Sequence, residues 1–86
     1  MQIITTTTAL QELAARFAKY PYMTIDTEFL RESTFWPILC LVQVATDDES
    51  AIIDPMAEGI DLQPLFDLLQ DENVLKVFHA GRQDLE

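Results

Sequence analysis

The feature that most limits the possible folds is the alternation of apolar and polar side chains over residues 23–30. A period of two is typical of a β-strand with one buried face. Asp26 and Glu28 lie two positions apart, so on a strand both carboxylates leave the same side of the sheet, roughly 7 Å apart. A divalent cation with oxygen ligands would relieve their repulsion and desolvation, whereas a solvated strand face needs no cation. The pair alone leaves both readings open.

Helix signals occur on either side of this strand. The first helix is predicted to begin at Thr8, with Gln11 completing a capping box, and to end before Pro21. The second is predicted to follow Asp61, with Pro64 tolerated in its first turn. The apolar faces expected to be buried are Leu10, Leu13, Ala14, Phe17 and Ala18 in the first helix and Leu62, Leu65, Phe66 and Leu69 in the second.

Four further segments have strand character. Residues 2–5 indicate a short edge strand, and the nearly continuous apolar run 38–45 predicts a strand buried on both faces. Short connections join residues 22–29, 38–45 and 51–54, so these should form a three-stranded antiparallel meander. Residues 74–79 are reached through a helix and should therefore run parallel to a strand of the meander. The predicted fold class is α/β, with flanking helices.

The composition is acidic, with 15 Asp and Glu against 5 Lys and Arg and a formal net charge of −10. Such a chain cannot present an extended basic surface to nucleic acid, so metal ions or further chain would have to supply positive charge. The hydrophobic fraction of 49% argues against disorder. No apolar run approaches the roughly 20 residues that span a bilayer, so no membrane partner is expected. The N-terminus lacks signal-peptide regions, and we expect a cytoplasmic protein.

Two segments carry a specific family resemblance. Residues 25–29 resemble the first exonuclease motif of the DEDD superfamily, and residues 77–86 resemble the second. Within that superfamily the chain is most similar to the ribonuclease D family. The Trp36-Pro37 pair and residues 53–55 also resemble the corresponding segments of that family. The resemblance covers essentially all 86 residues. It implies a ribonuclease H-like fold and 3′→5′ hydrolysis of RNA ends, including those of tRNA precursors.

The resemblance also implies roles for individual residues. Asp26, Glu28 and Asp84 would be three of the four acidic catalytic residues that bind two divalent ions, Mg²⁺ or Mn²⁺. Phe29 and His79 would lie near the terminal nucleotide of the substrate. For His79, a structural role at the end of the strand, with its ring hydrogen-bonded to the backbone, is an equal alternative. The family's third motif and its C-terminal RNA-binding domains are absent from these 86 residues. We therefore expect residues 1–86 to be the N-terminal portion of an exonuclease domain and to be inactive alone.

Two other functions remain open at this point. A proofreading-type DNA exonuclease shares the acids, and a non-catalytic member could bind RNA or protein through the same scaffold. The 79–81 stretch favours ribonuclease D, and the three intact acids argue against a binding-only role. A parallel strand without its next neighbour exposes an unpaired edge with Leu75 and Val77 beside it. We expect residues 1–86 to self-associate through that edge.

Overall fold

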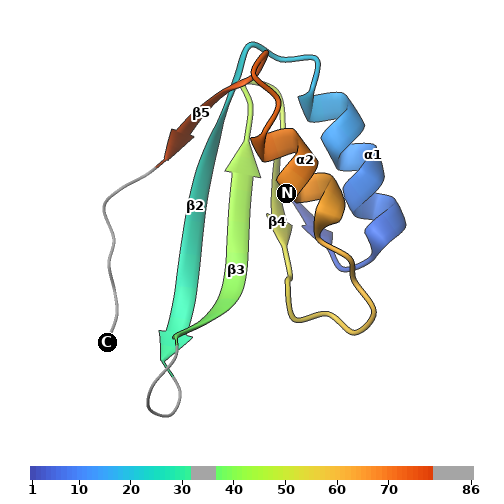
Figure 1. Ribbon diagram of the computed structural model, residues 1–86, viewed down its shortest axis with the longest axis vertical. Helices are drawn as coiled ribbons and strands as arrows, with labels where there is room; N and C mark the ends of the chain where they lie inside the picture. The colour runs from blue at the N-terminus through green and yellow to red at the C-terminus, as the bar shows by residue number, and fades with distance from the viewer. Residues whose placement is uncertain (32–36, 79–86) are drawn as a thin grey trace.

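The computed structural model describes residues 1–31 and 37–78. Within them, five strands form one mixed sheet in the order β1-β4-β3-β2-β5, and both helices lie over one face of it (Figure 1). The predicted α/β class, the meander and the parallel last strand are all confirmed. The elements are β1 (Gln2–Ile4), α1 (Thr7–Phe17), β2 (Tyr22–Arg31), β3 (Pro37–Ala45), β4 (Ser50–Ile53), α2 (Gln63–Leu69) and β5 (Leu75–Phe78).

The strand pairing explains where the helices lie. β2, β3 and β4 pair antiparallel, while β5 pairs parallel with β2 and β1 pairs parallel with β4. The expected edge position of β1 is confirmed. Its parallel pairing with β4 was not predicted from the sequence. Both helices connect parallel strands, and such crossovers place a helix against the sheet face. The C-terminal half of β2 extends beyond both helices (Figure 1).

The hydrophobic core lies between the sheet and the two helices. In α1 the buried residues are Leu10, Leu13 and Phe17, as predicted, but Ala14 is half-buried and Ala18 is exposed as the C-cap. In α2 the prediction for Phe66 was wrong, because its side chain is 45% exposed. The helix is rotated so that Leu65 and Leu68 face the core instead. The buried core residues are Ile4, Leu10, Leu13, Phe17, Met23, Ile25, Val42, Val44, Ala51, Ile53, Leu65, Leu68 and Val74.

The N-cap of the first helix lies two residues earlier than its pattern predicted, at Thr6 instead of Thr8. Thr6 is the N-cap: its backbone is extended, and its Oγ1 accepts a hydrogen bond from the Ala9 amide at 3.2 Å. The predicted capping box of Thr8 and Gln11 is therefore wrong, because Thr8 already lies inside the first turn. A run of four threonines offers several cap candidates, and the extended backbone at Thr6 selects one of them.

The expectation that the third strand is buried on both faces was also wrong. Val42 and Val44 are buried beneath the helices, while Leu41, Gln43 and Ala45 on the other face are only half-buried. The reason is that both helices lie on the same side of the sheet (Figure 1), so the described residues leave the other side open. We call this side the open face.

The turn between β3 and β4 is tied to the start of β2. The Tyr22 hydroxyl donates to the Asp47 carboxylate at 2.5 Å, and the Tyr20 hydroxyl donates to Asp48 at 2.8 Å. These hydrogen bonds to carboxylates raise the pKa of both tyrosines, because ionising the phenol would place a second negative charge beside the first. The contacts help to set the position of β2 relative to β3.

No helix in the described ranges is long and apolar enough to cross a bilayer.

Candidate metal centre

Asp26 and Glu28 lie on the open face of β2. Met23 and Ile25 are 0% and 3% exposed beneath the helices, and alternation along the strand places Asp26 and Glu28 on the opposite side. Asp26 is half-buried and Glu28 is exposed. The two carboxylates therefore share one face, as the spacing predicted.

Strand β3 supplies the other side of the site. Asp26 is paired with Gln43, and Thr24 is paired with Ala45. Together with Ile25, these residues line a hollow of about 280 Å³ on the sheet surface. Asp26 therefore lies at the wall of an open, partly polar hollow.

A β-bulge follows Glu28 directly. Glu28 pairs with Leu41, but Phe29 pairs with Leu39, so Cys40 has no partner on β2. Cys40 is half-buried, and its thiol lies 3.5 Å from the Glu28 carbonyl oxygen. A bulge bends a strand and re-aims its side chains, and bulges are frequent next to active sites. The extra residue belongs to β3, so the bulge bends β3 beside the part of β2 that carries the two acids.

The donor set suits a hard divalent cation. Within the described ranges, no side chain or backbone N–H donates a hydrogen bond to the Asp26 or Glu28 carboxylate. Mg²⁺ usually takes only one or two protein carboxylates and completes its shell with water or substrate oxygens. A pair of carboxylates on one face fits that requirement.

Several of the other predicted site residues lie outside the part of the chain that the structure describes. Asp84 and His79 lie outside the described residues, as does Trp36. Accordingly, the described part of the chain has no cluster of three or more His, Cys, Asp or Glu residues that could hold a metal. β5 runs parallel to β2 and ends with Phe78 paired to Ile25, one residue before Asp26. The third acid thus stays a prediction.

Phe29 is 52% exposed at the far end of β2. Strand alternation places it on the side opposite to Asp26 and Glu28, beyond the cover of the helices. Its substrate contact stays a prediction, and that contact would have to be made around the end of the strand.

Gln43 is the residue of this site that the sequence analysis did not select. It is the one strongly polar side chain in the apolar run 38–45, and this was the signal that could have identified it. Its position opposite Asp26 depends on the pairing of β2 with β3, which the sequence alone does not define.

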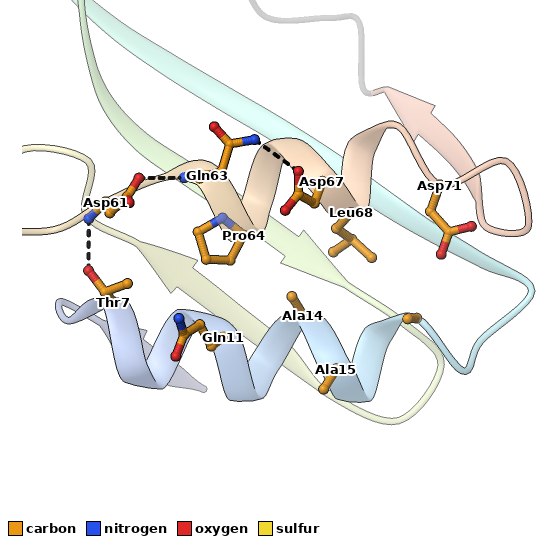
Figure 2. Close-up of a pocket in the computed structure, with 11 residues that line it drawn as sticks. Thr7, Gln11, Ala14, Ala15, Asp61, Gln63, Pro64, Asp67, Leu68 and Asp71 are labelled. Atoms are coloured by element: carbon orange, nitrogen blue, oxygen red, sulfur yellow. Dashed lines mark hydrogen bonds between the residues drawn. The ribbon is translucent and has the colours of Figure 1, made fainter.

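A larger hollow, of about 510 Å³, lies between α1 and α2 on the helix-covered side (Figure 2). Four of its polar residues are joined by hydrogen bonds. The Asp61 amide donates to Thr7 Oγ1 at 2.8 Å, and Gln63 donates from its amide to Asp61 and from its side chain to Asp67, both at 2.9 Å. This hollow is a joint between helices and is separated from the paired acids by the sheet.

The five-stranded mixed sheet with two flanking helices is a ribonuclease H-like fold, and Asp26 and Glu28 lie on its open face. A family model described as 3′-5′ exonuclease matches residues 1–86. The chain belongs to this 3′-5′ exonuclease family.

Relatives named Ribonuclease D are similar over the whole chain. The protein from Nitrobacter hamburgensis is 59% identical over 86 residues, which are 100% of this chain and 22% of the relative. The protein from Sphingobium indicum is 60% identical over 85 residues, covering 98% and 22% respectively. The chain thus spans about a fifth of the length of these relatives.

Solved structures agree with this assignment. Escherichia coli RNase D, described as an exoribonuclease involved in structured RNA processing, matches with a TM-score of 0.84 and 39% identity. The match covers 93% of this chain and 21% of that one. The catalytic core of RRP6 from Trypanosoma brucei matches with a TM-score of 0.84 at 22% identity, which supports the fold.

Proposed function

We propose that the full-length protein is a 3′→5′ exoribonuclease of the ribonuclease D type. The observation that carries the proposal is that the Asp26 and Glu28 carboxylates share the open face of a ribonuclease H-like sheet. The 3′-5′ exonuclease family is metal-dependent, and the carboxylate pair suits this requirement. The identity of 59% to a protein named Ribonuclease D favours RNA over DNA as the substrate.

In this proposal Asp26, Glu28 and Asp84 hold two divalent ions, Mg²⁺ or Mn²⁺. When bound, such ions supply the positive charge that activates water and stabilises the leaving oxygen in phosphodiester hydrolysis. Asp26 and Glu28 attract and orient the ions from one strand.

The proposed substrates are RNA 3′ ends, including those of tRNA precursors, and the proposed location is the cytoplasm. Phe29 and His79 would contact the terminal nucleotide. Because residues 1–86 carry a net charge of −10, we expect the RNA phosphates to be attracted by the bound ions and by parts of the protein beyond residue 86. We propose that residues 1–86 are the N-terminal portion of the exonuclease domain and are inactive alone.

The test uses RNA and DNA oligonucleotides of the same sequence, each labelled at the 5′ end. The full-length protein should shorten the RNA stepwise from its 3′ end with Mg²⁺ or Mn²⁺, and residues 1–86 alone should not. Preference for DNA would indicate a proofreading-type exonuclease, and RNA binding without cleavage would indicate a non-catalytic member. Activity that survives EDTA, or degradation from the 5′ end, would contradict the proposal.

Residues 1–86 on their own should also self-associate through β5. Among the described strands β5 is an edge, and its residues Leu75 and Val77 are 65% and 43% exposed. An unpaired edge with apolar neighbours favours strand pairing with a second copy. Light scattering over a dilution series should show dimers or larger species, and Val77→Lys should shift the population toward monomer. A monomer at tens of micromolar would refute this expectation.

A further inference from the structure

Gln43 has an unusual position for a polar side chain. It lies in the middle of β3 with Asp26 of β2 on one side and Ile52 of β4 on the other. Its neighbours along the strand, Val42 and Val44, are buried. The side chain is only half-buried, and no buried side-chain nitrogen or oxygen among the described residues lacks a partner, so any unbonded atom of this carboxamide is accessible to solvent. Its side chain makes no hydrogen bond to any residue in the described ranges.

The pairing register places Gln43 within reach of Asp26. Residues directly opposite in an antiparallel pair have Cβ atoms about 4.5–5.5 Å apart on the same face. Both residues line the same hollow, and both are half-buried. The length of a glutamine side chain therefore allows its carboxamide to reach the Asp26 carboxylate.

The other described neighbours of Asp26 on the open face are poorer hydrogen-bond donors to its carboxylate. Glu28 carries the same charge, and Ala45 and Leu41 have no side-chain donor. Thr24 has a single hydroxyl on the same strand, two residues away. Gln43 has two N–H donors directly opposite. Of the described side chains around Asp26, it is the one best placed to donate to this carboxylate.

We propose that Gln43 is a positioning residue for the metal site, an inference that rests on the proposed function. Its carboxamide would donate a hydrogen bond to the Asp26 carboxylate. This contact holds the carboxylate in the orientation that metal binding requires. No hydrogen bond joins the Asp26 and Gln43 side chains in the structure, although both line the same hollow, so the proposed contact requires a reorientation of one or both side chains. A neutral donor does this without adding charge to the site.

The test measures Mn²⁺ affinity of the full-length protein without RNA, by electron paramagnetic resonance of free Mn²⁺. Gln43→Met keeps the length of the side chain but removes the donors. It should weaken Mn²⁺ binding by about 10-fold or more, the range found when partners of metal ligands are removed. Gln43→Asn keeps a shorter carboxamide and should bind Mn²⁺ more tightly than Gln43→Met. The matched control is Ile52→Met on the same face, which should leave the affinity unchanged.

A second readout separates positioning from packing. The kcat of Gln43→Met on RNA should fall at low Mn²⁺ and recover as Mn²⁺ is raised, with KM for RNA unchanged. An affinity within about two-fold of the native protein would overturn the inference, whatever happens to activity, because removing such a partner typically costs at least 10-fold. Asp26→Asn in the same titration distinguishes the two proposals. If it also leaves affinity unchanged, the metal site has failed; if it weakens binding while Gln43→Met does not, only the role of Gln43 has failed.

Discussion

Asparagine at position 26 is expected to slow the shortening of RNA by the full-length protein by about 1,000-fold or more. Bound ions supply several kcal/mol of charge stabilisation in the transition state, and about 1.4 kcal/mol corresponds to a factor of ten in rate. Asp26→Asn keeps the shape of the side chain but removes the charge that holds the ions. Initial rates on a 5′-labelled RNA at saturating Mg²⁺ provide the measurement.

Glu58→Gln is the matched control for this experiment. Glu58 is an exposed acid outside the sheet, so the substitution changes the net charge by the same amount without affecting the open face. Its rate should stay close to that of the native protein. A loss below about ten-fold in Asp26→Asn would mean that Asp26 is not a principal ligand, because a factor of ten is only about 1.4 kcal/mol.

Alanine at position 17 is expected to lower the free energy of unfolding by about 3–5 kcal/mol, the usual cost of removing a buried phenylalanine ring. Phe17 is 0% exposed and is the largest fully buried side chain of the core. Its ring packs where the last turn of α1 meets the sheet, next to Tyr20 at a centroid distance of 6.4 Å. Urea unfolding followed by circular dichroism measures the change.

Glu12→Ala provides the comparison on the same helix. Glu12 is exposed, and surface substitutions of this kind usually change stability by less than about 0.5 kcal/mol. Equal midpoints for Phe17→Ala and Glu12→Ala would show that the described core does not stabilise the protein in the way its burial indicates.

Local periodicity accounts for the parts of the fold that the sequence predicted correctly. The spacing of Leu10, Leu13 and Phe17 defines one face of a helix whatever that helix packs against. The alternation around Asp26 and Glu28 likewise puts both acids on one side of any strand that contains them. These relations involve residues a few positions apart, so backbone geometry alone is sufficient to predict them.

The rotation of α2 shows where local patterns become insufficient. Phe66 and Leu68 are both apolar, and the sequence assigned the wrong one to the core. A seven-residue helix has less than two full turns to define its buried face. Its contacts with α1 and the sheet therefore decide which side faces inward.

The sequence by itself determined the elements, their order along the chain and the shared face of Asp26 and Glu28, because these depend on backbone geometry between near neighbours. Only the tertiary structure decided that both helices cover the same side of the sheet, that β1 pairs with β4, and that Gln43 lies opposite Asp26. Each of these depends on the register between segments far apart in the chain. A shift of one residue in that register would place Gln43 on the other face, so its proximity to the acids is a property of the folded sheet.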